Sequence, residues 1–260
     1  MSGKGTGLWL VGLGPGDLGN MSLDAVEVAK GCDYRFLEGY TALLPENQFE
    51  RLEKLVGGFS KVMRPEVEEP DEILTLAKDA KVALMVMGDP LQATTHVDLQ
   101  LRAADCGVEC HVVHGISVTT IVPGVVGLQS YRFGRQVTLA YPYGEYLATS
   151  PFQLIQNNRE GGLHTLVLLD LDPTGMGIEE QRPMSPKDAI SIIKKSSNKE
   201  GVDISDWMGV LCSDLGTSLQ MVMFGTLDEI AASDGGRINC LIIPGRLDDM
   251  ESRALERWRF

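Results

Sequence analysis

The sequence predicts an α/β protein with two α/β domains: an N-terminal parallel sheet with flanking helices, and a C-terminal mixed sheet with helices. Strand-like apolar runs alternate with helix-like segments through the first half of the 260 residues. One of these runs, residues 82–87, is apolar at every position, which is typical of a parallel strand buried on both faces. The alternation becomes less regular after residue 127, and we therefore expect domains at 1–127 and 128–260.

The N-terminal domain is expected to begin with a strand at residues 8–13, followed by a glycine-rich turn and a helix that starts at Ser22. Further strands are expected at 32–37, 59–63, 82–87 and 108–113, and further helices at 45–55, 71–79, 95–105 and 117–126. Thr95 and Asp98 form a cap-like pair at one helix start, and the acidic, proline-bounded segment 65–70 is expected to be a loop. This alternation predicts parallel strands joined by right-handed crossovers.

The C-terminal domain is expected to contain strands at 136–140, 165–169, 207–212, 221–225 and 239–243, and helices at 151–160, 186–195, 227–232 and 248–258. Ser185 and Pro186 form a strong helix start. The irregular spacing of the last strands favours antiparallel pairing. The glycine- and proline-rich stretch 171–186, which includes Arg182, is long for a connection within a compact domain and predicts a functional loop or lid.

The composition excludes several classes of protein. Hydrophobic residues make up 43% and charged residues 23%, as in folded chains and unlike disordered or fibrous ones. With 23 basic and 36 acidic residues the net charge is −13, and no cluster of positive charge is available to neutralise phosphates, so nucleic acid is not an expected partner. The apolar runs are too short for a membrane span, and the polar N-terminus lacks the pattern of a signal peptide.

Five cysteines without a CxxC pair predict reduced, mostly buried thiols in a cytoplasmic protein, and no zinc site.

The glycine-rich turn Gly12-Leu13-Gly14-Pro15-Gly16-Asp17 first suggests a dinucleotide fingerprint. That fingerprint needs its third glycine where Asp17 stands, and its helix opens within the glycine run. Here the helix begins only near Ser22, and Pro15 removes one amide donor. The turn therefore lets a ligand approach the backbone without cradling a diphosphate. NAD binding is disfavoured, and an ordinary tight turn stays as the alternative.

Gly88-Asp89-Pro90 follows the buried strand, at the edge where open α/β sheets bind ligands, although the same triplet suits an ordinary type I turn. His96 could act as a base at a helix start, but we favour a packed side chain bonded to a backbone group. His111 and His114 point to opposite faces of a strand, which argues against a shared metal, and His164 is expected to be structural. These patterns identify no catalytic residue.

The glycine and aspartate motifs resemble those of a known enzyme class. Residues 12–17 are similar to the first loop of the tetrapyrrole-methylase class of S-adenosylmethionine enzymes, and GDP before a threonine-rich helix start is the second signature of that class. Residues 88–96, Gly-Asp-Pro-Leu-Gln-Ala-Thr-Thr-His, resemble the diphthine synthase family in particular. The downstream residues that share this resemblance are His114 with Ser117, 133–134, 140–142, 162–165, 168–170 and 243–245.

The resemblance covers residues 8–247 and implies a tetrapyrrole methylase-like fold and a homodimer, with S-adenosylmethionine folded into a cleft between the domains. It implies methylation of the amino group of the aminocarboxypropyl-modified histidine in translation elongation factor 2, a step of diphthamide biosynthesis, with S-adenosylhomocysteine as product. By motif, the residues expected to bind the cofactor are Pro15, Asp89, Gln92, Ser117, Val118, Leu169, Leu215 and Asn239. No metal is expected.

Methyl transfer from a sulfonium needs positioning more than acid–base groups, so we expect the amine to be held ~3–3.5 Å from the methyl carbon. Asp89 is expected to recognise polar groups of the cofactor, the amine to lose its proton largely to water, and the loop 171–186 to meet the protein substrate. The sequence leaves open whether three or four methyl groups are added. The alternatives are a methyltransferase for a corrin or porphyrin precursor, a nucleotide-binding module without catalysis and, last, an NAD-linked oxidoreductase.

Overall fold

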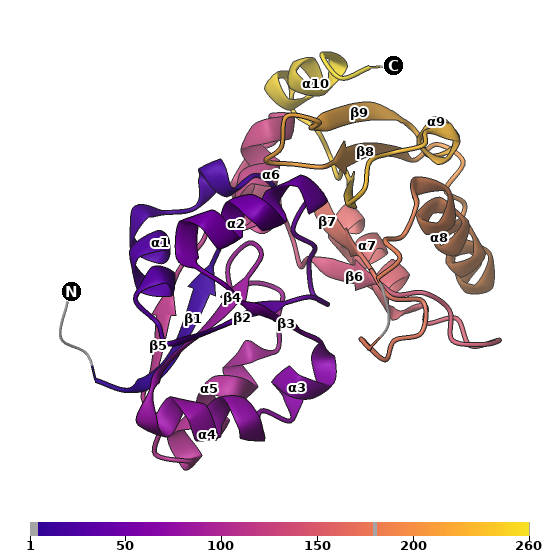
Figure 1. The fold of residues 1–260 in the computed structure, drawn as a ribbon. Helices are drawn as coiled ribbons and strands as arrows, with labels where there is room; N and C mark the ends of the chain where they lie inside the picture. The colour runs from indigo at the N-terminus through magenta and orange to yellow at the C-terminus, as the bar shows by residue number, and fades with distance from the viewer. Residues whose placement is uncertain (1–4, 179–180, 260) are drawn as a thin grey trace. The chain divides into compact units, whose positions relative to one another are not determined.

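The computed structural model of the chain describes residues 5–178 and 181–259 (Figure 1). These residues form two compact units, each with its own sheet. The first unit extends to Val118 and includes the segment 176–178, and the second contains 119–175 and the described residues from 181 onward. The division falls at the start of helix α6 (Val118–Val126), whereas the sequence places the domain boundary just beyond its end, between 127 and 128. That boundary stays a prediction.

The first unit is built on five parallel strands. They are β1 (Gly7–Gly12), β2 (Tyr34–Glu38), β3 (Ser60–Val62), β4 (Lys81–Val86) and β5 (Cys110–Val113). Their order is β3-β2-β4-β1-β5, and Leu10 of β1 pairs with Leu84 of β4 and Val112 of β5. Because every pair is parallel, the carboxyl ends of the strands meet at one edge of the sheet. The strand expected to be buried on both faces is confirmed in β4.

Helices cover both faces of this sheet. They are α1 (Leu23–Lys30), α2 (Phe49–Val56), α3 (Arg64–Glu68), α4 (Asp71–Asp79) and α5 (His96–Asp105), with 3-10 turns at Leu18–Asn20 and Glu46–Gln48. α1 and α2 pack with Trp9 on one face, and α3, α4 and α5 pack with Leu10 on the other (Figure 1). The expected start of α1 is confirmed, because the Ser22 hydroxyl accepts a hydrogen bond from the Ala25 N–H.

The segment 65–70 is not the loop that the sequence predicts, because it overlaps helix α3. Pro65 lies in the first turn of this helix, where its missing N–H is not needed. The Glu66 carboxylate accepts the Met63 N–H at 3.0 Å and satisfies one of the free donors at the helix start. Proline therefore lies at the start of a helix here, whereas we expected it to bound a loop.

The cap-like pair predicted at residues 95 and 98 is also wrong. Thr95 precedes α5 with φ −99° and ψ 7°, outside the extended conformation that a capping residue adopts, and its side chain makes no cap bond. The Asp98 carboxylate instead accepts from the Arg102 Nε at 2.6 Å, one turn further along the helix.

The second unit contains a mixed sheet, as the sequence predicts. Its strands are β6 (Val137–Leu139), β7 (Thr165–Leu169), β8 (Met208–Ser213), β9 (Met221–Thr226) and β10 (Asn239–Ile243). Their order is β6-β7-β10-β8-β9. β6 and β7 are parallel, and the three remaining pairs are antiparallel. The carboxyl end of β7 therefore lies at the same edge as the start of β10 and the end of β8.

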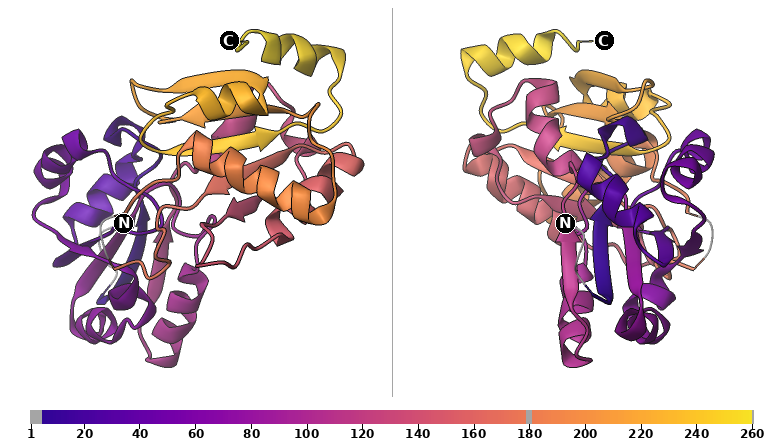
Figure 2. Two further views of the ribbon diagram at one scale, coloured as in Figure 1. Left: turned by 90° about the vertical axis from the view of Figure 1, so that its right-hand side faces the viewer. Right: turned by 60° about the vertical axis from the view of Figure 1, so that its left-hand side comes forward.

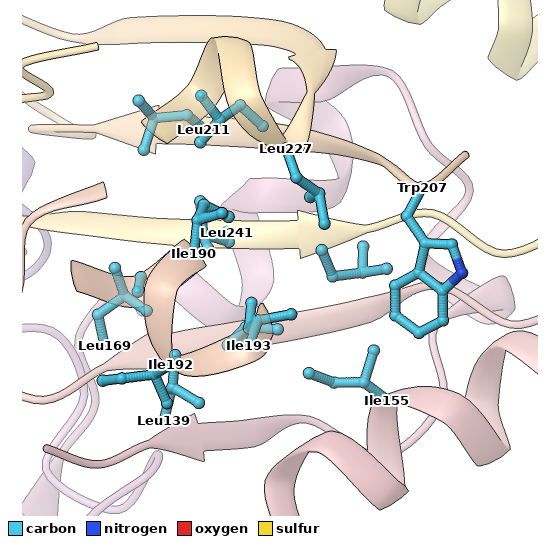
Figure 3. Packing of buried hydrophobic residues seen from close by; sticks show 14 of the residues in the cluster. Leu139, Ile155, Leu169, Ile190, Ile192, Ile193, Trp207, Leu211, Leu227 and Leu241 are labelled. Atoms are coloured by element: carbon cyan, nitrogen blue, oxygen red, sulfur yellow. The ribbon is translucent and has the colours of Figure 1, made fainter. Parts of the chain in front are cut away.

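The helices of the second unit are α6 (Val118–Val126), α7 (Ser150–Glu160), α8 (Pro186–Glu200), α9 (Leu227–Ala232) and α10 (Asp249–Glu256), with a 3-10 turn at Ser130–Arg132. α7, α8 and α9 contribute buried side chains to one core against the sheet. Figure 3 shows Ile155 of α7, Ile193 of α8 and Leu227 of α9 in one cluster with Leu241 of β10. α8 lies along this face of the sheet (Figure 2).

Helix α8 begins where the sequence predicts. The Ser185 hydroxyl accepts the Asp188 N–H at 3.1 Å, and the helix ends at Gly201, whose φ of 69° is easily reached only by glycine. None of the helices within the described ranges is both long and apolar enough to span a bilayer.

Candidate functional site

Three glycines pack backbone against backbone at the carboxyl edge of the first sheet. Gly12 ends β1, Gly88 follows β4, and Gly115 follows β5. A Cβ atom on Gly115 would lie 2.1 Å from the Gly88 carbonyl oxygen, and one on Gly12 would lie 2.4 Å from the Gly115 nitrogen. Both distances are far shorter than any real contact, so only glycine permits the strand ends to approach this closely.

The glycine turn is joined to the Gly88 turn by two backbone hydrogen bonds. The Gly14 N–H donates to the Gly88 carbonyl at 3.1 Å, and the Gly88 N–H donates to the Gly14 carbonyl at 2.9 Å. The turn continues past Pro15, whose carbonyl accepts from the Asn20 side chain at 3.0 Å, and α1 begins only at Leu23. The first α-helix therefore opens beyond the glycine run, which agrees with the sequence argument against a dinucleotide fingerprint.

Asp89 ties the ends of β4 and β5 together. Its side chain is 6% exposed, and its Oδ1 accepts from the Leu91 N–H at 2.9 Å. Its Oδ2 accepts from the Gly115 N–H at 3.2 Å and lies 2.8 Å from Nδ1 of His114. Sequence reasoning missed the His114–Asp89 pair. The signal that could have found it is that both residues closely follow parallel strands, whose carboxyl ends share an edge.

Two further residues of the 88–96 motif, Thr94 and His96, contact the Pro90 carbonyl. It accepts from the Thr94 hydroxyl at 2.6 Å and lies 2.8 Å from Nδ1 of His96. His96 is 1% exposed, and burial lowers its pKa. This confirms the favoured interpretation, a packed histidine bonded to the backbone. Gln92, predicted to contact the cofactor, is exposed in the same turn, and Ala93 has φ 57°.

The other predicted cofactor residues of the first unit lie on the same edge. Pro15 is buried in the glycine turn, Ser117 is 5% exposed, and Val118 is half-buried at the start of α6. A Cβ on Gly88 would meet only the Ser117 Cα, at 3.9 Å, so there is open space directly beside the Gly88 backbone. The edge thus offers a ligand bare backbone and small side chains.

The predicted cofactor residues of the second unit share an edge of its own sheet. Leu169 ends β7, and Asn239 begins β10, where it pairs with Ser213 at the end of β8. The Asn239 side chain is 7% exposed and accepts from the Ser213 hydroxyl at 2.6 Å and from the Gly236 N–H at 2.9 Å. Asn239 therefore holds the turn that precedes β10. Leu215, two residues beyond β8, is buried.

Asp170, directly after Leu169, organises the start of the predicted lid. Its Oδ1 accepts from the Leu171 N–H at 2.8 Å, and its Oδ2 accepts from the Tyr141 N–H at 3.3 Å. Arg182 is exposed, lies over the Tyr141 ring at 5.7 Å, and donates its backbone N–H to the Leu171 carbonyl at 2.7 Å. Residues 179 and 180 of the predicted lid lie outside the described residues.

His164 has the structural role that the sequence predicts. Its side chain is fully buried, its Nε2 lies 3.1 Å from Oε1 of Glu251, and its Nδ1 accepts from the Gly245 N–H at 3.0 Å. Burial lowers its pKa. Across residues 5–178 and 181–259, no three His, Cys, Asp or Glu side chains gather as a metal site. The cysteines are free thiols, and three of the five are buried.

Comparisons with known proteins agree with this architecture. The family model for tetrapyrrole (corrin/porphyrin) methylases matches residues 7–231. The chain is 35% identical to the diphthine synthase of Methanoregula boonei, with 96% of this chain and 98% of the relative covered. It is 34% identical to the diphthine synthase of Methanosarcina mazei, with 95% and 94% covered.

Two solved structures have the same fold. A crystal structure from Entamoeba histolytica superposes with a TM-score of 0.89 at 32% identity and covers 98% of this chain and 99% of that one. A crystal structure of a diphthine synthase gives a TM-score of 0.85 at 28% identity, with 97% and 95% covered. The predicted fold class is confirmed, and the chain belongs to the tetrapyrrole methylase family and, within it, to the diphthine synthases.

Proposed function

We propose that the chain is an S-adenosylmethionine-dependent methyltransferase of diphthamide biosynthesis, a diphthine synthase. Its substrate is the amino group of the aminocarboxypropyl-modified histidine of translation elongation factor 2. The observation that carries this proposal is the glycine edge of the first sheet, where close backbone packing leaves open space beside Gly88. Relatives named diphthine synthase, which match nearly the whole chain, support it.

The edge suits a nucleoside with a sulfonium better than it suits a diphosphate. It presents backbone groups and Ser117, and Pro15 stands where a phosphate loop would need an amide. Cofactor binding is proposed for Pro15, Asp89, Gln92, Ser117 and Val118 of the first unit, and for Leu169, Leu215 and Asn239 of the second. S-adenosylmethionine supplies an activated methyl group, which a neutral amine displaces from sulfur, the bonding electron pair staying on the sulfur.

The chain's own contribution is positioning. Holding an amine in line for attack supplies ~7–11 kcal/mol in effective-molarity terms, without a strong acid or base. The hydrogen bonds that join the Gly14 and Gly88 turns, and those that hold Asp89, fix the edge against which the reactants would lie. Backbone held this firmly does not need to reorganise when a ligand binds.

Mass spectrometry of the substrate protein tests the function. Elongation factor 2 carrying the aminocarboxypropyl-histidine is incubated with this chain and S-adenosylmethionine, and the number of added methyl masses is counted. The expected result is three or four methyl groups on that one residue. An unmodified factor, together with methylation of a corrin or porphyrin precursor in a parallel incubation, would transfer the assignment to the alternative substrate class.

Calorimetry tests the cofactor site separately. Asp89→Ala is expected to weaken S-adenosylmethionine binding, because it releases the turn that follows β4. Asp98→Ala, an exposed aspartate on α5, is the matched control and is expected to bind normally. Unchanged affinity in the Asp89 variant would remove that residue from the cofactor site.

The proposed assembly is a cytoplasmic homodimer, and light scattering of the purified chain tests the dimer.

The loop 171–186 is proposed to contact elongation factor 2. Arg182→Ala is expected to slow methylation of the factor while cofactor affinity stays the same, since the Arg182 side chain is exposed and lies over the Tyr141 ring. Equal rates for the variant and the unmodified chain would reject that contact.

A further inference from the structure

His114 differs from the other three histidines in its exposure. Its side chain is 71% exposed, whereas those of His96 and His164 are buried and that of His111 is 17% exposed beside Trp9. Despite this exposure the imidazole is oriented, because its Nδ1 lies 2.8 Å from Oδ2 of a nearly buried Asp89. An exposed ring held by a buried carboxylate is the arrangement of an oriented proton acceptor.

The carboxylate in this pair is itself fixed. Oδ1 of Asp89 accepts from the Leu91 N–H, and Oδ2 also accepts from the Gly115 N–H. Gly115 is locked in turn, because it packs against the backbones of Gly12 and Gly88. The position of His114 is therefore set by the same strand ends that form the proposed cofactor edge.

The hydrogen bond also selects the tautomer of the ring. An ionised carboxylate can only accept, so Nδ1 of His114 must donate to Asp89. In the neutral imidazole, Nε2 is then unprotonated and carries a lone pair. Within the described part of the chain, the His114 ring makes one hydrogen bond, the one between its Nδ1 and Asp89. Its Nε2 is therefore available to a substrate.

The proposed reaction needs such an acceptor. An alkyl amine is mostly protonated at neutral pH, and its nitrogen can attack a methyl carbon only after a proton has left. We propose that His114 is the catalytic residue that takes this proton at Nε2, with Asp89 as its positioning residue. The amine N–H bond breaks, its electron pair stays on nitrogen as the nucleophile, and an Nε2–H bond forms. The exposed imidazolium then returns the proton to water.

This inference rests on the proposed function and deepens it. The sequence alone predicts that the amine loses its proton largely to water, whereas the structure offers a side chain as the acceptor of that proton. It also gives Asp89 a second role besides its part in the cofactor edge. Positioned acids and bases contribute ~10²–10⁴-fold to rate, which sets the size of the effect to be expected.

Nitrogen NMR of the ring tests the tautomer without any turnover. In the ¹⁵N-labelled chain, the neutral His114 ring is expected to carry its proton on Nδ1. In Asp89→Asn this preference is expected to fall. A ring that carries its proton on Nε2 would overturn the proposal, and an unchanged tautomer in the Asp89 variant would overturn the positioning role.

Kinetics with matched variants test the proton transfer. His114→Gln keeps an N–H donor for Asp89 but has no basic nitrogen, and we expect methyl transfer to fall ~10²–10⁴-fold with cofactor affinity unchanged. His114→Ala is expected to regain rate when imidazole is added to the solution. His111→Gln, within β5 and in contact with Trp9, is the control and is expected to keep its rate.

The possible failures are distinguishable. Transfer by His114→Gln at the rate of the unmodified chain would overturn this inference and leave the proposed function intact. A loss of cofactor affinity that accounts for the whole loss of rate would also overturn it, because the side chain would then serve binding. If the unmodified chain transfers no methyl group to the factor, the proposed function fails and this inference fails with it.

Discussion

The two units each bury a glutamate, and the donors around the two side chains differ. Glu38 ends β2 at the carboxyl edge of the first sheet and is 1% exposed. Its carboxylate accepts from the Thr41 N–H at 2.9 Å and from the Thr41 hydroxyl at 2.7 Å. Glu251 of α10, fully buried in the second unit, accepts instead from four residues. Its donors are the N–H groups of Gln129 and Asp248, the His164 ring and the Arg132 guanidinium.

These donors decide how each carboxyl ionises. Burial raises the pKa of Glu38 to about 7, and the hydrogen bonds from Thr41 offset only part of this rise. Burial also acts to raise the pKa of Glu251, but the hydrogen bonds from Gln129, Asp248 and His164 outweigh it and hold the pKa below the ordinary value. A buried carboxylate is therefore stable as an anion only where several donors replace the water it has lost.

The two regions are also held together by different means. At the glycine edge of the first sheet the strand ends touch backbone to backbone, which needs side chains to be absent at Gly12 and Gly115. In the second unit, Glu251 joins α10 to Gln129 and to His164, so a side chain connects segments far apart in sequence. We expect the first region to fail when an atom is added, and the second to fail when a carboxylate is removed.

The largest expected effect is that of Glu251→Ala. It removes the carboxylate that faces Nε2 of the buried His164 and one of the two carboxylates paired with Arg132, so the free energy of unfolding should fall by about 3–5 kcal/mol. Urea denaturation measures this loss. Glu256→Ala is the control on the same helix. Glu256 is exposed, and its carboxylate makes a long surface ion pair with the Arg259 Nε at 3.8 Å, so no measurable change is expected. Equal midpoints for the two variants would show that the buried network does not hold α10.

Glu38→Gln should change how stability depends on pH. The folded pKa of Glu38, about 7, lies above the ordinary value of 4.5, so the folded chain binds more protons than the unfolded chain between these values. The native chain should therefore lose roughly 2–3 kcal/mol more than the variant as pH rises from 5 to 8. Urea denaturation of both at the two pH values measures the difference, and parallel losses would contradict the raised pKa.

Gly115→Ala tests the backbone contacts of the first region. The added methyl group would meet the Gly88 carbonyl oxygen at 2.1 Å, and backbone cannot rotate away as a side chain can. Overpacking of this kind costs about 1–3 kcal/mol, and cofactor binding should weaken with it. At Gly19 nothing lies within 4 Å of the added atom, so Gly19→Ala is the matched control. A stable Gly115 variant with normal affinity would show that the strand ends can separate freely.

The difference between the regions also explains what the sequence predicts and what it does not. The glycine edge leaves a trace, because Gly12, Gly14 and Gly88 lie at or just beyond the ends of strands and mark where backbone must approach backbone. Strands and helices were predicted closely for a similar reason, since apolar runs and caps such as Ser22 are local.

The Glu251 network has no local trace. Glu251 and His164 are 87 residues apart, and each alone is an ordinary charged or polar residue. The His114–Asp89 pair was missed because strand order, which sequence patterns do not fix, brings the two together. The burial of Glu38 has only a weak trace in the sequence. Glu38 is a charged residue that directly follows the apolar pair Phe36 and Leu37 at the end of a strand.

Thr41→Val gives the smallest expected effect and tests the donor argument itself. It removes the hydroxyl that donates to Oε2 of Glu38 and keeps the N–H that donates to Oε1. At pH 5, where the Glu38 carboxyl is protonated, Thr41→Val should lower the free energy of unfolding by about 1 kcal/mol. At pH 8, where the carboxyl is ionised, the loss should be roughly twice as large, because hydrogen bonds to a charged group are about twice as strong. The pKa of Glu38 should rise above 7 in this variant, which NMR titration of the labelled carboxyl carbon measures directly.

In a Glu38→Gln background the pH dependence of the Thr41 substitution should disappear, since no charge remains for the hydroxyl to stabilise. If the cost of Thr41→Val were the same at both pH values, the number of donors would not be what separates Glu38 from Glu251.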